Sequence, residues 1–334
     1  MMVRNALLAA VGTAALWAGG AHAQNPPAFS TARIPVIVKA TTSQFWATVF
    51  AGATEAARVL NIKIEKQGAT AETDVAGEVN IMENAIATKP TAIVIAATNA
   101  VALAAPIAKA TAAGIPVIMI DSAASTDKYV TFLATNNETG GQKAADAMAA
   151  CVKARTGKEE GKVAYLTALA GAQSLNDRDK GFVEELKKYP GLQIVDHRVG
   201  NNDPSKALSD SEDLLTKTPD IVGIFADNEL EGDGAGQAVS DKKLGSKMCL
   251  VAFDTSDQEV RFLRDGTIYG LIVQNPFMMG YAGVWDALAA SQGVVFPKFI
   301  DSGVHVVTKD NVDSPAMAGL LDPKKYKLAP FIGD

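Results

Sequence analysis

The sequence predicts an α/β fold made of two doubly wound parallel-sheet lobes. Short apolar runs alternate with segments whose apolar residues recur at helical spacing, which is typical of parallel strands covered by helices. This alternation pauses near Asn136 and then restarts, so the 334 residues contain two similar α/β halves in succession. Because small-ligand pockets favour domain interfaces, the repeat indicates a cleft between the halves.

The first predicted element is a buried strand at 34–38. A helix follows it, because Val49, Ala53, Ala56 and Leu60 recur on one face. Further apolar runs predict strands at 62–65, 92–96, 115–120, 129–134, 163–166, 192–195, 221–225, 250–253, 268–273 and 304–307. Helical spacing predicts helices at 75–86, 101–112, 144–152, 179–189, 207–215, 260–263 and 278–290, with another around Gly236. Beyond residue 307 we expect loop-like sequence.

The N-terminus has the features of a signal peptide. Arg4 supplies the positive charge, residues 6–18 form an apolar run, and Ala21-His22-Ala23 predicts cleavage after Ala23. The run is too short for a comfortable membrane anchor, and no later run approaches the ~20 apolar residues of a spanning helix. A net charge of -6 without a basic run argues against nucleic acid and anionic membranes as partners. The sequence therefore predicts a soluble, exported protein.

The two cysteines, Cys151 and Cys249, allow two interpretations. Exported proteins often contain disulfides, and the predicted elements place both residues at the sheet edge opposite the ligand, so a bond between them is plausible. Two separate buried thiols are an equally good interpretation.

Several predicted strands end in a polar residue suited to binding a small molecule. Asp121, Asn228 with its neighbour Asp227, and Asp254 each follow a different strand. Ligands bind at this carboxyl edge of open parallel sheets, and carboxylates accept hydrogen bonds from adjacent hydroxyls. Turns and helix caps also occur there, but three coincident strand ends favour binding over capping. Lys39 interrupts an apolar strand edge and could either donate to a ligand or pair with Asp121.

Other side chains near the same edge suit a polyhydroxylated ligand. Arg178 offers a planar fork of donors, and Gln274 offers both a donor and an acceptor. Phe45 and Trp46 offer flat apolar surfaces for a sugar ring. The alternatives are a solvated surface position for Arg178, a polar strand end for Gln274 and core packing for the aromatic pair.

Signatures of catalysis, cofactors and metals are absent from the sequence. It contains no H-E-x-x-H, no G-x-S-x-G and no Walker loop, and His197 and His305 stand alone. The glycine-rich run 232–236 falls inside a predicted helix and does not fit G-x-G-x-x-G, so it predicts close helix packing. We therefore expect no enzyme activity, no cofactor and no metal site.

A set of short motifs resembles the periplasmic sugar-binding proteins of ABC importers, of the ribose- and allose-binding type. The motifs are FW at 45–46, GIPVIMIDS, R-x-x-GF at 178–182, FADN at 225–228, VAFD at 251–254 and VQNP at 273–276. The resemblance covers most of the mature chain, from Ile34 to Val307, and the motifs are specific together rather than singly. It implies a type I periplasmic binding protein, with two lobes and a three-strand hinge that close around a monosaccharide or polyol.

The resemblance also implies lobes, partners and ligand contacts. The N-terminal lobe would be 24–134 plus 275–304, the C-terminal lobe 135–274 plus 305–334, and the hinge would cross near 134–135, 274–275 and 304–305. A monomeric chain would then deliver its ligand to an ABC permease and its ATPase. The implied ligand contacts are Lys39, Ser43, Phe45, Trp46, Asp121, Arg178, Asn228, Asp254 and Gln274.

Some positions depart from the family pattern. Ser43 stands where the family often has Asn, Ser122 stands where Arg often follows the aspartate, and no aromatic lies near Asn202. These differences imply one fewer charge and one fewer aromatic wall in the pocket. Lys39 with Trp46 resembles the allose-binding members, which points toward a hexose or related polyol.

Three other functions are alternatives to transport. A receptor that feeds a chemoreceptor or a sensor kinase is compatible with the same site. A repressor-like sensor core shares this fold but needs an N-terminal helix-turn-helix, where this chain has a signal peptide. A secreted α/β enzyme would need the nucleophile or metal groups that are missing.

Overall fold

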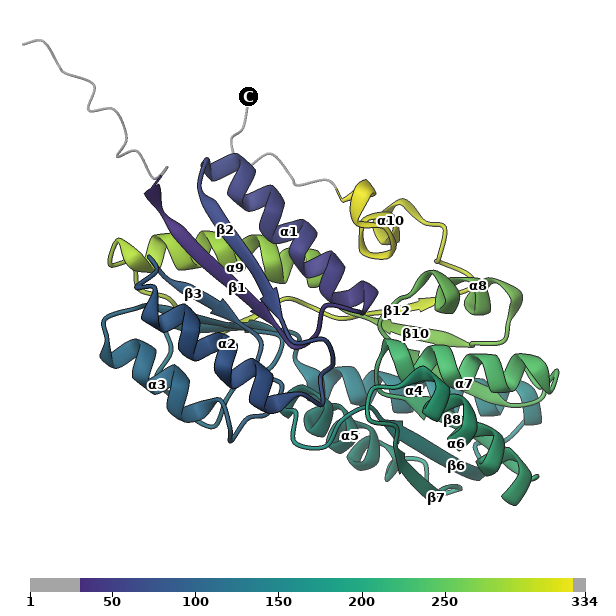
Figure 1. Ribbon diagram of the computed structural model, residues 1–334. Coiled ribbons are helices and arrows are strands. Elements are labelled where there is room, and N and C mark those ends of the chain that lie inside the picture. Colours follow the sequence, from purple (N-terminus) through teal and green to yellow (C-terminus); the bar gives the residue numbers. More distant parts are fainter. Residues whose placement is uncertain (1–30, 327–334) are drawn as a thin grey trace, which may run out of the picture.

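The computed structural model describes residues 31–326, which fold into two α/β lobes lying side by side (Figure 1). The predicted signal peptide and its cleavage site after Ala23 lie outside these residues. Each lobe has a sheet of six strands with helices on both faces, which confirms the predicted doubly wound fold. No helix in this part of the chain is long and apolar enough to cross a membrane.

The first lobe is built on a parallel sheet with the strand order β11-β5-β4-β3-β1-β2. Its strands are β1 (Arg33–Val38), β2 (Lys63–Gly68), β3 (Ile93–Ile95), β4 (Val117–Ile120), β5 (Thr131–Ala134) and β11 (Phe299–Asp301). The central strands are runs of Val and Ile buried on both faces, as a covered parallel sheet requires. Helices α1 (Gln44–Leu60) and α9 (Pro276–Ser291) cover one face, and α2 (Val75–Ala87) and α3 (Ala104–Ala112) cover the other.

The second lobe repeats this layout with the strand order β12-β10-β9-β8-β6-β7. Its strands are β6 (Gly161–Thr167), β7 (Leu192–Val199), β8 (Ile221–Ala226), β9 (Cys249–Phe253), β10 (Gly270–Val273) and β12 (His305–Thr308), of which only β12 is antiparallel to its neighbour. Helices α4 (Asn137–Thr156) and α5 (Gln173–Leu186) cover one face, and α6 (Pro204–Lys217), α7 (Glu229–Asp241) and α8 (Asp257–Asp265) cover the other. By position in the two orders, β1 corresponds to β6 and β4 corresponds to β9.

Glycines let helices approach closely in both lobes. A Cβ atom at Gly52 of α1 would lie 1.9 Å from the carbonyl oxygen of Phe277 in α9. In α7, a Cβ atom at Gly234 would lie 2.5 Å from the carbonyl oxygen of Pro204, at the start of α6. The glycine-rich run 232–236 therefore serves close helix packing, as the sequence predicted.

The described chain passes between the lobes at three places. These are the links from β5 to α4, from β10 to α9, and from β11 to β12. They match the three hinge crossings implied by the family resemblance.

Short elements near the C-terminus differ from the sequence predictions. The strand β11 was not predicted, because three residues give too little apolar pattern. The helix α10 (Pro315–Leu321) and a 3₁₀ turn (Pro323–Lys325) occupy residues expected to be loop.

One helix of the first lobe also differs from its prediction. The helix α3 begins at Ala104 instead of Val101, because residues 101–103 form a turn.

The C-terminal segment touches both lobes. Leu320 and Leu321 of α10 pack against the core of the second lobe. Tyr326 instead stacks on Phe277 of α9, with the ring centroids 4.4 Å apart, and its hydroxyl accepts a hydrogen bond from Asn275 Nδ2 at 3.0 Å. The predicted boundaries gave residues 305–334 to the second lobe, whereas Tyr326, the last described residue, packs against the first lobe.

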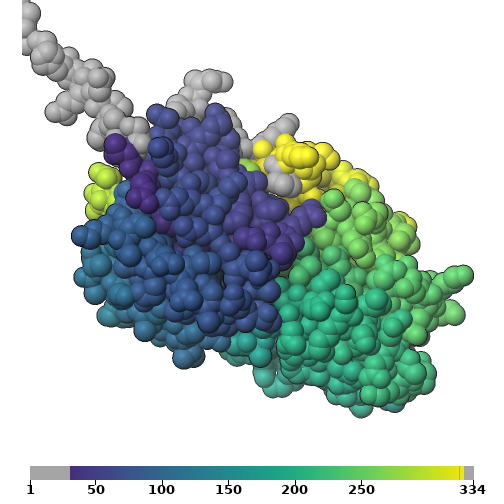
Figure 2. Space-filling view, viewed as in Figure 1, coloured from purple at the N-terminus to yellow at the C-terminus, as the bar shows by residue number. Residues whose placement is uncertain are grey.

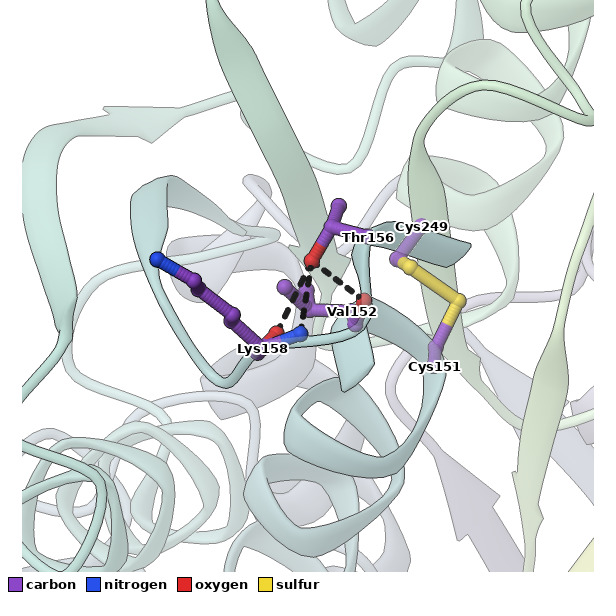
Figure 3. Close-up of a disulfide and its surroundings, with 5 residues drawn as sticks. All are labelled: Cys151, Val152, Thr156, Lys158 and Cys249. Carbon is purple, nitrogen blue, oxygen red and sulfur yellow. Dashed lines mark hydrogen bonds between the residues drawn. A yellow bond between two sulfur atoms is a disulfide. The ribbon is translucent and has the colours of Figure 1, made fainter. Parts of the chain in front are cut away.

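A disulfide joins Cys151 and Cys249 in the second lobe (Figure 3). Cys151 lies in the last turns of α4 and Cys249 opens β9, so the bond ties a covering helix to the sheet. Thr156 closes the same helix end by donating to the carbonyl oxygen of Val152 at 2.9 Å (Figure 3). Of the two interpretations of the cysteines, the disulfide is the one that the structure contains.

Candidate ligand-binding site

All nine predicted contact residues line one cavity between the lobes. The volume of this cavity is about 30 Å³. Lys39, Ser43, Phe45, Trp46 and Asp121 come from the first lobe; Arg178, Asn228, Asp254 and Gln274 come from the second lobe or its hinge end.

The first lobe contributes a buried ion pair at the ends of β1 and β4. The Lys39 ammonium lies 2.8 Å from Asp121 Oδ2, and both side chains are 3% exposed. The ammonium also donates to Ser122 Oγ at 2.9 Å and to Ser174 Oγ at 3.3 Å. Two serine hydroxyls therefore accept hydrogen bonds from the ammonium, and Asp121 balances its charge. Asp121 has a φ of 56°, a left-handed backbone that an aspartate adopts at some cost and that often marks a functional site.

Two aromatic rings beside this pair start helix α1. Ser43 is the N-cap of the helix, and its hydroxyl accepts the backbone N–H of Trp46 at 3.3 Å. The cap fixes the first turn, and the rings of Phe45 and Trp46 meet edge to face with centroids 4.8 Å apart. Both rings are buried, so they serve the core and the cavity wall together.

The second lobe contributes Arg178, which is 2% exposed. The solvated surface position, which the sequence left open as the alternative for this residue, is therefore not the one it occupies. Its Nε donates to Asn137 Oδ1 at 2.9 Å, its Nη1 donates to the carbonyl oxygen of Asp227 at 2.8 Å, and the guanidinium lies 3.8 Å above the ring of Phe253. Within residues 31–326 Nη2 has no hydrogen-bond partner, so the fork is anchored on one side and has donors to spare on the other.

Asp254 and Gln274 lie at the ends of the neighbouring strands β9 and β10. Asp254 has a φ of 77°, so a second strand of the site ends in a left-handed aspartate. Its Oδ1 accepts Gln274 Nε2 at 2.6 Å, and its Oδ2 lies 3.7 Å from Arg178 Nη1. Gln274 Oε1 is enclosed and has no partner among the described residues. A buried carbonyl without a donor is costly, and a ligand hydroxyl would remove that cost.

Asn228 acts as both a helix cap and a cavity wall. Its side-chain oxygen accepts the backbone N–H of Glu231 at 3.0 Å, and its Nδ2 donates to Asn202 Oδ1 at 2.6 Å. The adjacent Asp227 points away from the cavity, because its Oδ1 accepts the backbone N–H of Ala168 at 2.8 Å. Capping and lining are therefore not alternatives at this strand end.

The lobes are held together around the cavity by hydrogen bonds. On one side, Ser122 Oγ donates to Ser174 Oγ at 2.7 Å. On the other, the Glu229 carboxylate of α7 accepts the backbone N–H groups of Gln44 at 3.0 Å and Phe45 at 2.7 Å. The space-filling view shows the two lobes in contact along their boundary (Figure 2). The structure is therefore a closed form, in which these bridges complete the cavity.

Sequence reasoning missed six residues that line the cavity. Glu72 follows the polar strand β2, and Ser174 and Leu175 lie in the first turn of α5, so no buried apolar run pointed to them. Glu229 directly follows a predicted residue, and the strand-end rule extended by one position would have included it. The missed residues are Glu72, Ser174, Leu175, Asn202, Glu229 and Leu230.

The cavity carries more acids than bases. Burial raises the pKa of Glu229 to about 8, although two backbone N–H groups oppose the shift. Burial also raises the pKa of Glu72 and of Asp254, opposed by Lys39 for the first and by Arg178 for the second. Closing the lobes over these groups removes water that would stabilise their charge. Hydroxyl donors from a ligand would replace that water.

The lining suits recognition without chemistry. It combines carboxylates, amides and a guanidinium with aromatic surfaces, which together match a ring that carries hydroxyls. In the described part of the chain, no group of three or more His, Cys, Asp or Glu side chains is placed to hold a metal ion.

The sequence matches the family model "Periplasmic binding protein domain" over residues 34–294. The chain belongs to the periplasmic binding protein family. Membership agrees with the resemblance seen in the sequence motifs and places the chain in the periplasm. The type I fold of this family accounts for the two similar sheets and the three crossings.

Three relatives show how far the similarity extends. The D-allose-binding periplasmic protein of Escherichia coli K12 is 25% identical over 77% of this chain and 84% of its own length. A carbohydrate transporter solute-binding protein from Agrobacterium radiobacter, solved with D-arabinose, is 44% identical with a TM-score of 0.86, over 87% of this chain and 99% of that one. An ABC transporter solute-binding protein from Agrobacterium vitis, solved with D-fucose, is 37% identical with a TM-score of 0.82, over 86% and 99%. Each is a binding protein and none is an enzyme, in agreement with the sequence-based prediction.

Proposed function

We propose that this periplasmic binding protein captures a monosaccharide or polyol between its lobes and delivers it to an ABC permease and its ATPase. The observation that carries the proposal is the convergence of nine residues, implied by the family resemblance and spread along the sequence, on one buried cavity. Carboxylate and amide groups there suit hydroxyls, and the aromatic pair suits the apolar face of a sugar ring. Relatives that share 37% and 44% of the sequence hold D-fucose and D-arabinose.

Binding would work by differential contacts in the open and closed forms. Asp121 and Trp46 belong to the first lobe, and Arg178 and Asp254 belong to the second, so a ligand reaches both sets only when the lobes close. A ligand that contacts both sets stabilises the closed form. Hinge closure of this kind is established for the family. The closed surface is then what the permease would recognise.

The proposal includes the maturation and assembly of the chain. The leader would be removed after Ala23, and the mature chain would work as a monomer in the periplasm. A chemoreceptor that recognises the same closed surface is a second partner compatible with this design.

A ligand screen tests the function directly. The mature chain, residues 24–334, is mixed with pentoses, hexoses and polyols, and melting temperature and isothermal titration are recorded. We expect a rise in melting temperature for at least one sugar, since a ligand at 100 times its Kd stabilises the native state by about 2.7 kcal/mol. Small-angle scattering should show a more compact particle with that sugar. No change in melting temperature and no heat of binding with any sugar of the panel would contradict the proposal. Turnover of a bound sugar would support the enzyme alternative.

A further inference from the structure

The acid Glu72 lines the cavity but belongs to none of the motifs that pointed to the site. It lies on the loop between β2 and α2 and is 6% exposed. Its backbone carbonyl accepts a hydrogen bond from Thr98 Oγ1 at 2.7 Å, which fixes the loop. Its Oε1 accepts the indole N–H of Trp46 at 2.7 Å, and its Oε2 has no partner within residues 31–326. Half of this carboxylate is therefore committed to the protein and half is available to a ligand.

The charge balance of the cavity gives this acid a consequence for selectivity. Two cations, Lys39 and Arg178, face four carboxyl groups. Lys39 is ion-paired with Asp121 at 2.8 Å and donates to two serines, and the charge of Arg178 is shared with Asp254 at 3.7 Å. A further carboxylate, brought by a ligand, would therefore find no cation without an acid beside it in a site of low dielectric. The four carboxyl groups belong to Glu72, Asp121, Glu229 and Asp254.

We propose that Glu72 is a specificity-determining contact of this cavity, an inference that rests on the proposed sugar-binding function. Oε1 holds the plane of the Trp46 indole, and Oε2 accepts a hydrogen bond from a hydroxyl of the ring that lies on it. Because Glu72 offers an acceptor and each cation of the cavity already has an acid beside it, the cavity admits uncharged sugars and rejects sugars that carry a carboxylate. This also assigns Lys39 to balancing Asp121, not to binding an acidic ligand.

The variant Glu72→Gln tests both parts. An amide keeps an acceptor for the indole but turns a donor toward the cavity and removes the charge. The neutral sugar bound most tightly by the wild type is compared with the acid of the same configuration, such as D-galactose with D-galacturonate or D-arabinose with D-arabinonate. Titration calorimetry should show about a ten- to hundredfold loss of affinity for the neutral sugar in the variant. The ratio of neutral to acidic affinity should fall at least as much.

Glu78→Gln is the matched control. Glu78 is another buried acid of the same lobe, accepts the backbone N–H of Thr98 at 2.8 Å and does not line the cavity. We expect it to leave both affinities unchanged. If Glu72→Gln does not fold, Glu72→Asp keeps the charge but withdraws the oxygens by one methylene; it should lose affinity for the neutral sugar and still reject the acid.

The outcomes separate this inference from the proposed function. A wild type that binds none of the pentoses, hexoses and polyols contradicts the function itself. A wild type that binds the acid as tightly as the neutral sugar overturns the inference alone. So does an unchanged affinity in Glu72→Gln or Glu72→Asp. A loss of affinity at an unchanged ratio in Glu72→Gln also overturns it, because Glu72 would then only hold the indole.

Discussion

Asp121 and Asp254 occupy equivalent places in the two lobes but have different partners. Each follows the strand that stands third in its sheet order, and each has a left-handed backbone. Each backbone N–H also donates to a carbonyl oxygen of the next strand, Leu133 at 3.1 Å and Ile272 at 2.9 Å. Asp121, however, forms a close ion pair with Lys39 at 2.8 Å, whereas Arg178 stays 3.7 Å from Asp254.

The two cations of the cavity differ in how closely they are paired within the protein. The Lys39 ammonium donates to two serines and lies 2.8 Å from Asp121, so its charge is balanced before any ligand arrives, although Asp121 Oδ2 accepts no hydrogen bond within the described chain. The second-lobe half keeps unpartnered groups within the described chain, Nη2 of Arg178 and Oε1 of Gln274. We infer that the first pair chiefly stabilises the fold and that the second chiefly binds the ligand. Replacing each cation in turn tests this division.

The largest expected effect is on stability, from Lys39→Met. Removing one partner of a buried ion pair leaves the other charge uncompensated, which typically costs about 3–5 kcal/mol. Urea unfolding of the sugar-free chain should show a loss of this size. The double variant Lys39→Met with Asp121→Asn should recover most of it, because Asn tolerates the left-handed backbone of Asp121.

An exposed pair of the same separation provides the control for Lys39. Lys162 and Asp220 also lie 2.8 Å apart, but they are 44% and 63% exposed. Lys162→Met should change the stability little, because solvent screens such pairs. If the double variant at the cavity is as unstable as Lys39→Met alone, the ion pair does not explain the loss.

The next largest effect should be on affinity, from Arg178→Lys. Lysine keeps the charge but loses the planar fork and the stacking on Phe253, which lies 3.8 Å away. Disrupting a buried, hydrogen-bonded charge at a binding site costs about 2–5 kcal/mol, so the Kd should rise roughly thirtyfold or more. Titration calorimetry with the sugar found in the screen measures this rise.

Arg58→Lys is the control for that variant, because Arg58 is exposed and pairs with Glu55 on the surface of α1. Its affinity should equal that of the wild type. A Kd for Arg178→Lys within threefold of the wild type, with Lys39→Met binding far more weakly, would reverse the proposed roles of the two lobes.

The fold and the strand-end residues of the site could be predicted from the sequence for one physical reason. A short apolar run that forms a buried strand can be recognised from neighbouring residues alone, so β1, β4, β8 and β9 could be located from the sequence. The residue after each of these strands falls at the ligand edge of the sheet. Asp121 and Asp254 follow from that rule alone.

What the sequence could not provide depends on contacts between distant segments. Asp227 and Asn228 are adjacent, and only the three-dimensional neighbours decide that Asn228 faces the cavity and Asp227 does not. Arg178 could be buried because Asn137 and a backbone carbonyl accept its N–H groups, which no local pattern reveals. Glu72 was missed because the strand β2 before it is polar and half exposed, and so carries no apolar signal.

The smallest effects should come from Glu229, which bridges the lobes without belonging to either half of the ion-pair comparison. Its carboxylate accepts two backbone N–H groups at the start of α1, at 2.7 Å and 3.0 Å. Glu229→Gln keeps one acceptor and loses the other, so closure should weaken by about one hydrogen bond, or about 0.5–1.5 kcal/mol. Asp257→Asn is the control, because Asp257 is exposed at the same boundary. Its Oδ1 accepts a hydrogen bond from Gln44 Nε2 at 3.4 Å, and its backbone N–H donates to Gln44 Oε1 at 3.1 Å.

The pH dependence of binding distinguishes Glu229 from a passive contact. Burial in the closed form, aided by the neighbouring acids Asp254 and Asp233 and opposed by the two N–H groups, raises the pKa of Glu229 to about 8. In the open form the carboxyl is free of that burial, and its pKa returns toward the ordinary value of 4.5. Closure therefore takes up a proton between these values, so its contribution is complete below about pH 4.5 and is lost as the pH rises through about 8. Affinity measured from pH 5.5 to 8.5 should fall in the wild type and fall less in Glu229→Gln; equal slopes would show that Glu229 keeps the same protonation state in both forms.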